Sequence, residues 1–158
     1  MSNKSKGRPV DALDAVCKAH KECLRCARQE YGDNCLSDTV RYRSGWSDGQ
    51  NWAAYGTADN PNLSLEAKCR DQANTCKRAL CECDVAFAKA HAELSNLYNY
   101  QYSGDFDQTD PNSCPTSSGS ADMQCCNNAD KSTLFKLYNA DKMQCCADGS
   151  LQEMGQFC

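Results

Sequence analysis

The sequence predicts a mainly α, disulfide-rich fold, in which two long antiparallel helices carry a small β-hairpin or loop wing and a small cysteine-rich C-terminal module. Fourteen of the 158 residues are cysteine, an even number that is typical of a disulfide scaffold. Two stretches repeat apolar residues at the three- and four-residue spacing of an amphipathic helix. Large aliphatic residues are scarce, so we expect cross-links to supply stability that burial alone cannot.

The cysteine content also predicts an oxidising, extracellular compartment. The competing interpretation is a zinc site at Cys23-x-x-Cys26, although zinc sites rarely need so many thiols and the chain has only two histidines to help. No stretch is long enough to span a bilayer. The net charge of -4 gives no broad attraction to nucleic acid or anionic membranes. We therefore expect a secreted protein with no transmembrane segment and no nucleic-acid partner.

Residues 1–9 are polar and basic and lack the apolar segment of a signal peptide. We therefore expect that the numbering describes a processed chain or that an export signal has been left out. Asn3-Lys4-Ser5 and Asn62-Leu63-Ser64 fit the N-glycosylation pattern, which suits a secreted protein.

A first helix is predicted from Asp11 to about Tyr31. Asp11 can cap the first turn, and Asp14 places a second carboxylate near the helix N-terminus. The helical periodicity stops at Gly32-Asp33-Asn34. The predicted buried face includes one histidine and comprises Leu13, Val16, Cys17, His20, Cys23 and Leu24.

Residues 35–68 form a connector rich in aromatic and turn residues, which suits a small hairpin with irregular flanks. Its aromatic side chains could form a sugar or lipid platform. We favour packing over the helices, which otherwise have little large apolar cover. The aromatic residues are Tyr42, Trp46, Trp52 and Tyr55.

A second long helix is predicted to begin near Leu65 or Cys69 and to continue to about Tyr98. Many residues of its apolar stripe are small, which lets a partner helix approach closely. Two antiparallel helices stapled by cystines are therefore expected. The stripe comprises Ala79, Leu80, Cys83, Ala86, Phe87, Ala90, Leu94 and Leu97.

A polar, acidic linker at 101–113 is expected to separate a helical domain at 1–100 from a cysteine-rich module at 114–158. We expect the linker to be solvated, and the alternative is a weak calcium or mineral contact. The linker lacks the glycine and terminal glutamate of an EF-hand, so a high-affinity calcium site is not expected. The weak candidate ligands are Asp105, Asp107 and Asp110.

The C-terminal module contains a repeated motif, because Met123-Gln124-Cys125-Cys126 recurs as Met143-Gln144-Cys145-Cys146. Leu134 to Tyr138 is the apolar run available as its core. Adjacent cysteines seldom bond to each other, so each pair should reach two different partners. The six cysteines of the module allow too many pairings for the sequence to choose among. This layout loosely resembles short cystine-knotted modules of invertebrate extracellular matrix and shell proteins.

The first helix resembles the active-site helix of the secreted phospholipase A2 family, whose pattern runs Pro-Val-Asp-x-Leu-Asp, paired cysteines, His-Asp and Cys-Tyr. The matching residues here are Pro9 to Asp14, His20 and Cys23. The segment Cys69-x6-Cys76-x4-Cys81-x-Cys83-Asp84 is similar to the family's second helix. The resemblance covers residues 9 to about 100.

The resemblance implies that His20 is a base that takes a proton from water and that Asp84 orients it by a hydrogen bond. One further family cystine lacks both halves here, since Val16 and Ala90 occupy its positions. The cystines that the resemblance implies are Cys23–Cys83, Cys35–Cys76 and Cys69–Cys81. Cys17 and Cys26 stay unassigned. They either bond each other under strain or clamp the C-terminal tail onto the first helix.

The chain departs from the family where catalysis is concerned. Lys21 stands where the family has the aspartate that binds calcium, a cation that needs six to eight oxygen ligands. No glycine-rich calcium loop precedes Pro9 in this sequence, and Leu24 replaces a tyrosine of the histidine–aspartate network. These departures argue against hydrolysis and predict that the protein has no cofactor. His20 and Asp84 would then be a vestigial pair or a purely structural one. If the chain were instead an active phospholipase A2, its cofactor would be calcium.

Three functions follow, in order of preference. The first is a non-catalytic, secreted phospholipase A2-like protein that acts as an extracellular binding or structural component, with a protein, matrix or mineral partner. Lipid contact and oligomerisation are left open. The second is a calcium-dependent phospholipase A2 that hydrolyses the sn-2 esters of glycerophospholipids, with its metal loop outside this chain or on a partner. The third is a membrane-damaging lysine variant, which the acidic net charge disfavours.

Overall fold

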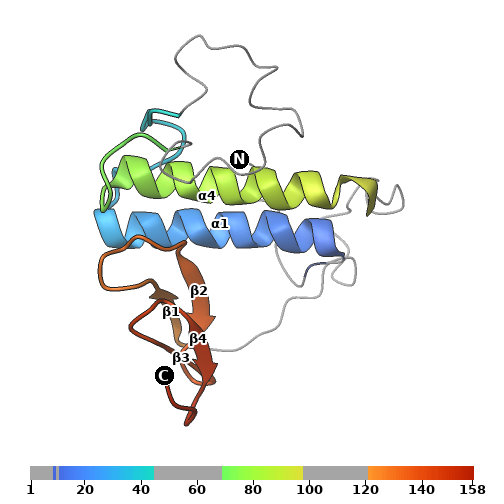
Figure 1. Ribbon diagram of the computed structural model, residues 1–158, viewed down its shortest axis with the longest axis vertical. Helices are drawn as coiled ribbons and strands as arrows, with labels where there is room; N and C mark the ends of the chain where they lie inside the picture. Colours follow the sequence, from blue (N-terminus) through green and yellow to red (C-terminus); the bar gives the residue numbers. More distant parts are fainter. Residues whose placement is uncertain (1–8, 10, 45–68, 98–120) are drawn as a thin grey trace, which may run out of the picture.

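The computed structural model describes residue 9 and residues 11–44, 69–97 and 121–158. Two helices, α1 (Ala12–Tyr31) and α4 (Cys76–Glu93), lie side by side and antiparallel, and a short 3-10 turn, η1 (Ser95–Leu97), follows α4 (Figure 1). Within these described ranges, neither helix is long and apolar enough to cross a membrane. The prediction of a disulfide-rich, mainly helical fold is confirmed.

Two small antiparallel sheets lie on the α1 side of the helix pair (Figure 1). One pairs β1 (Met123–Cys126) with β2 (Lys136–Asn139), and the other pairs β3 (Met143–Cys145) with β4 (Leu151–Glu153). Each copy of the Met-Gln-Cys-Cys motif therefore opens a hairpin. The tips of the predicted aromatic wing, including Trp46, Trp52 and Tyr55, lie outside the described residues.

Helix α1 begins and ends where the sequence predicts. Asp11 is the N-cap in extended backbone, and its carboxylate accepts a 2.7 Å hydrogen bond from the Asp14 N–H. At the other end Gly32 has a φ of 92°, which favours glycine, and its N–H donates to the Arg28 carbonyl. The helix bounds thus follow from capping chemistry alone.

The buried face of α1 differs from the predicted face at Cys17. His20 and Cys23 are buried as predicted, and Cys26 and Ala27 extend the same face. Cys17, in contrast, is exposed. It lies three residues before His20, in a part of the helix where fewer side chains are covered.

Helix α4 begins later than the sequence predicts, and the early start near Cys69 is wrong. Thr75 is the N-cap, with extended backbone and a hydroxyl that accepts a 3.3 Å hydrogen bond from the Arg78 N–H. Asn74 has a φ of 56°, a left-handed conformation that a helix cannot continue through. Cys69 instead forms an isolated antiparallel bridge with Ser44.

Helix α4 also ends earlier than predicted, because Leu94 is its C-cap. The stripe residue Leu97 is 53% exposed in η1 and therefore does not belong to the core. The other predicted limits, Leu65 and Tyr98, lie outside the described residues.

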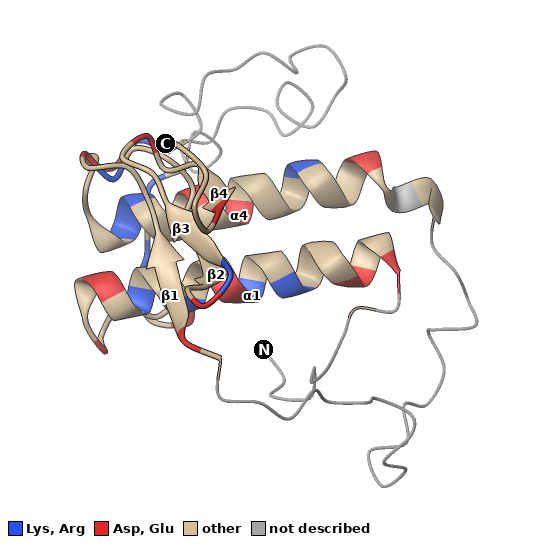
Figure 2. Ribbon diagram, turned by 90° about the horizontal axis from the view of Figure 1, so that it is seen from below, with Lys and Arg blue, Asp and Glu red and all other residues tan. Residues whose placement is uncertain are grey.

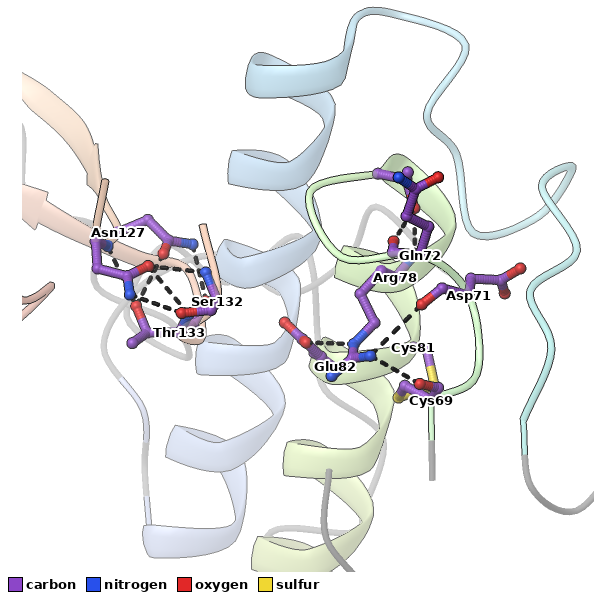
Figure 3. A network of polar contacts seen from close by, with 11 residues as sticks. Cys69, Asp71, Gln72, Arg78, Cys81, Glu82, Asn127, Ser132 and Thr133 are labelled. Carbon is purple, nitrogen blue, oxygen red and sulfur yellow. Dashed lines mark hydrogen bonds and ion pairs between the residues drawn. A yellow bond between two sulfur atoms is a disulfide. The ribbon is translucent and has the colours of Figure 1, made fainter. Parts of the chain in front are cut away.

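A buried arginine anchors the segment that precedes α4 (Figure 3). Arg78 Nε donates to Glu82 Oε1 at 2.6 Å, and its Nη1 donates to the carbonyl oxygen of Cys69 at 2.9 Å. Both charged side chains are buried, so each needs these partners to offset its lost hydration. The Cys69–Cys81 disulfide fixes the same segment covalently.

Cysteine sulfurs fill much of the core, as the scarcity of large aliphatic residues predicts. Among the described residues, Leu80 is the largest fully buried side chain, and the next in size are all cysteines. Phe135, 6% exposed, joins the same core cluster and meets the Tyr31 ring edge-on at 6.2 Å. The hairpins and the helices thus share a core. The domain limits at 1–100, 101–113 and 114–158 stay a prediction.

The three cystines that the resemblance implies are confirmed. Cys23–Cys83 joins α1 to α4, Cys35–Cys76 joins the segment after α1 to the start of α4, and Cys69–Cys81 closes a shorter loop. Native disulfides of this kind stabilise a fold by roughly 2–4 kcal/mol each, largely by restricting the unfolded chain.

A fourth disulfide, Cys26–Cys125, joins α1 to β1. Cys26 thus clamps the C-terminal part onto the first helix, and the alternative Cys17–Cys26 pairing is wrong, since their Cα atoms are about 13 Å apart along one helix. Adjacent cysteines do reach different partners, as the remaining pairs Cys126–Cys145 and Cys146–Cys158 show. Within the described part of the chain the Cys17 thiol is unpaired, and Cys114 lies outside that part.

Candidate functional site

The candidate site lies between the two helices, where His20 of α1 meets Asp84 of α4. His20 Nε2 is 2.6 Å from Asp84 Oδ1, and His20 is 6% exposed. The Cys23–Cys83 disulfide fixes this register, because Cys23 lies one turn after His20 and Cys83 directly precedes Asp84. Two residues far apart in the sequence are thereby held in hydrogen-bond contact.

Tyr42 adds a second hydrogen bond to the same carboxylate. Its hydroxyl donates to Asp84 Oδ2 at 2.6 Å. Sequence reasoning missed this polar role, since it predicted only that Tyr42 packs over the helices; Tyr42 is indeed partly buried against the core. One signal in the sequence could have indicated this role. Leu24 replaces a tyrosine of the family's histidine–aspartate network, so the second oxygen of the half-buried Asp84 needs a donor from elsewhere in the chain.

The two hydrogen bonds set the charge on Asp84. Burial raises the pKa of Asp84, but the hydrogen bonds from His20 and Tyr42 and the charge of His20 outweigh it, so this pKa lies below its ordinary value. Burial raises the pKa of Tyr42 well above its usual range, and the hydrogen bond to Asp84 raises it further. Asp84 is therefore a carboxylate and Tyr42 a neutral phenol at neutral pH.

Phe87 covers one face of the imidazole. Its ring is stacked on His20 with centroids 4.6 Å apart and planes 27° apart, and it also contacts His91 at 5.6 Å. Phe87 lies three residues, or about one turn, after Asp84, so the predicted apolar stripe of α4 places it beside the histidine. The stacked ring fixes the orientation of the imidazole plane.

His20 and Asp84 have the geometry of an imidazole oriented by a carboxylate, which is the geometry that a general base uses. Because Asp84 engages Nε2, the other ring nitrogen of His20, Nδ1, is the one that remains to accept a proton. Ester hydrolysis also needs a group that stabilises the developing oxyanion. The chemistry of the residues next to His20 therefore decides what the site can do.

Lys21 follows His20 on α1 and is exposed. An ammonium group has three donors and no acceptor, so Lys21 cannot ligate a cation. Among the described residues, no group of three or more His, Cys, Asp or Glu side chains is arranged to hold a metal ion. The position after His20 therefore supplies no oxygen ligand to calcium, a cation that takes six to eight of them. The weak candidates Asp105, Asp107 and Asp110 lie outside the described residues.

Comparison with known proteins finds phospholipases A2 and their homologues. The chain is 30% identical over 95 residues to basic phospholipase A2 2 of Bungarus caeruleus, which is 58% of this chain and 56% of that protein. It is 32% identical over 97 residues to basic phospholipase A2 homolog Pgo-K49 of Cerrophidion godmani, covering 61% and 55%. It is 28% identical over 105 residues to phospholipase A2 AP-PLA2-II of Acanthaster planci, covering 61% and 59%.

The chain thus spans little more than half the length of these curated relatives. No family model matches the chain, and no solved structure matches it.

Proposed function

We propose that this chain, which carries a phospholipase A2-like domain, is a non-catalytic extracellular protein that uses the phospholipase scaffold for binding. The observation that carries the proposal is Lys21, which directly follows His20. The resemblance places a calcium-binding carboxylate at that position. An ammonium group there reverses the local charge, so a divalent cation is repelled where the family attracts one.

The contacts of His20 support a structural role for the residues that remain. Asp84 accepts from both His20 and Tyr42, and Phe87 stacks on the imidazole. A partly buried polar network in which each member is hydrogen-bonded favours one packing of the helices. Such a network stabilises the fold even in a protein that catalyses no reaction.

The cystines support the extracellular assignment. Six disulfides bind the described elements together, and disulfides persist in oxidising compartments. An extracellular protein, matrix or mineral partner is the proposed target of such a rigid, cross-linked scaffold.

The test is an ester-hydrolysis assay on the full, oxidised chain. Phosphatidylcholine vesicles are incubated with the protein in millimolar calcium or in a chelator, and released fatty acid is measured. We expect no release above the protein-free rate, and no change in His20→Gln or in His91→Gln, the exposed histidine that serves as the matched control. Calcium-dependent release that His20→Gln abolishes and His91→Gln keeps would overturn the proposal.

One observation favours a second candidate, a calcium-dependent phospholipase A2. The His20–Asp84 pair has the orientation that a proton-accepting imidazole needs. That activity would require oxygen ligands from residues outside the described part of the chain or from a partner. The same assay decides between the two.

A further inference from the structure

A pocket of about 210 Å³ on the exposed side of α1 has a strongly basic wall. Lys21, Arg25 and Arg28 line it from successive turns, and their spacing of four and three residues places them along one face of the helix. Among the described residues that line this pocket, none is acidic. Figure 2 shows basic segments in blue and acidic segments in red along α1, in a chain whose net charge is -4.

The other walls of this pocket are apolar. Leu24 of α1 and Leu36, which is 37% exposed, lie beside the cations, and the fully buried Leu80 of α4 closes the bottom. The segment that carries Leu36 is held in place by the neighbouring Cys35–Cys76 disulfide. Lys21, Arg25 and Arg28 thus form a basic rim. The apolar floor beside this rim consists of Leu24, Leu36 and Leu80.

The described carboxylates near Arg25 and Arg28 offset the charge of these two arginines only in part. Arg28 pairs with Asp33 at 2.9 Å, but the Asp33 side chain is 91% exposed, and such solvated pairs contribute little and exchange readily. Burial raises the pKa of Glu22, and the charges of Lys18 and Arg25 offset this effect only in part. Arg25 makes no hydrogen bond or ion pair with the part of the chain that the structure describes.

We propose that this pocket binds a single phosphate or sulfate ester whose organic group is apolar. The planar guanidinium group of Arg25 presents paired N–H donors that match two oxygens of such an ester. Arg28 donates from Nε and Nη2 to the exposed Asp33 carboxylate, and it adds its charge and its Nη1 donors to the site. The ester's organic group then covers Leu24 and Leu36 and removes their surface from water. This inference deepens the proposed binding function and rests on it, because it names the class of ligand.

The first experiment titrates the full, oxidised chain with octyl sulfate below its micelle concentration, by isothermal titration calorimetry. We expect one site per chain. Arg25→Gln and Arg28→Gln should each weaken binding about tenfold, as loss of a charge-assisted hydrogen bond does. Lys18→Gln removes the same charge from the same helix but outside the pocket, so its affinity should stay within about twofold of the unaltered chain.

A second arm tests the apolar floor. Leu36→Ser should weaken octyl sulfate about fivefold and leave the affinity for inorganic sulfate unchanged, because inorganic sulfate has no apolar group. Near-ultraviolet circular dichroism verifies that each variant keeps the fold. An equal loss in Lys18→Gln and Arg25→Gln, or no binding of octyl sulfate at millimolar concentration, overturns the proposal.

A third arm distinguishes the sources of the ester. Vesicles of phosphatidylcholine and phosphatidic acid are sedimented with the chain and with Arg25→Gln. Binding that Arg25→Gln removes, together with octyl sulfate binding, identifies a lipid phosphate as a source, whereas octyl sulfate binding alone identifies a free ester. Vesicle binding without octyl sulfate binding contradicts a single-ester pocket. Calcium-dependent hydrolysis would instead refute the proposed function and leave these binding results unaffected.

Discussion

Cys26 of α1 is disulfide-bonded to Cys125 of β1, and this bond joins residues 99 positions apart. Beside it, Phe135 packs into the same core as Leu80 of α4. The cysteine-rich hairpins are therefore fastened to the helix pair both covalently and by burial. The stability of the helices should depend on that attachment.

Replacing Cys26 and Cys125 together by alanine should lower the free energy of unfolding by roughly 2–4 kcal/mol, because the bond closes a long loop. The matched control replaces Cys146 and Cys158, which lie 12 positions apart near the exposed C-terminal residues. Denaturant unfolding of both variants measures the difference. A larger loss of stability in the control would contradict the claim that the helices depend on the Cys26–Cys125 bond.

Tyr42→Phe removes the hydroxyl that donates to Asp84 and should cost about 1 kcal/mol of unfolding free energy. Tyr138→Phe is the matched control, since its hydroxyl donates an exposed 3.3 Å hydrogen bond to Gln124. We expect the control to change stability by less than about 0.5 kcal/mol. Equal effects of the two variants in urea unfolding would show that the Tyr42–Asp84 hydrogen bond stabilises the fold no more than the exposed one does.

The pKa of Asp84 predicts a pH dependence. Because the folded chain holds this pKa below the ordinary value of 3.8, the ionised carboxylate stabilises the fold above that value, and this stabilisation is lost as the pH falls below it. Asp84→Asn should therefore have a flatter stability curve below about pH 5 than the unaltered chain. Parallel curves for the unaltered chain and Asp84→Asn would refute the assignment.

The sequence predicts local features well and long-range ones only through resemblance. Asp11 and Gly32 mark the ends of α1 because caps are local chemistry. The Cys23–Cys83 cystine can be predicted only through the phospholipase A2 resemblance. Neither route predicted the start of α4, where Asn74 takes a left-handed conformation directly before the Thr75 N-cap.

In the candidate site, too, some contacts can be predicted from the sequence and others cannot. His20 and Asp84 carry the family motif, so the resemblance alone is enough to predict their contact. The hydroxyl of Tyr42 reaches Asp84 across 42 positions, and no local pattern records such a pairing. Cys125 likewise has several candidate partners in the sequence, and only packing against α1 selects Cys26.

Gly149 lies against the turn between β1 and β2, where Asn127 Nδ2 donates to the Thr133 carbonyl at 2.8 Å (Figure 3). A Cβ at Gly149 would lie 2.7 Å from Thr133 Oγ1 and 2.9 Å from the Asn128 backbone nitrogen, so Gly149→Ala forces the turn to move. Gly155→Ala is matched, because it has a similar positive φ and open space around it. We expect Gly149→Ala to cost about 1–3 kcal/mol more than Gly155→Ala in thermal unfolding. Equal costs would contradict the close contact.

The central claim is that Lys21 prevents calcium from binding beside His20, and the most direct measurement follows the imidazole itself. The His20 ring signals are recorded by ¹H–¹⁵N correlation spectroscopy while calcium is raised to about 10 mM, beyond the range in which extracellular calcium modules saturate. The account predicts no saturable shift of the His20 signals, in the unaltered chain or in the Lys18→Gln control. A saturable calcium-dependent shift at His20 that magnesium does not reproduce would contradict it.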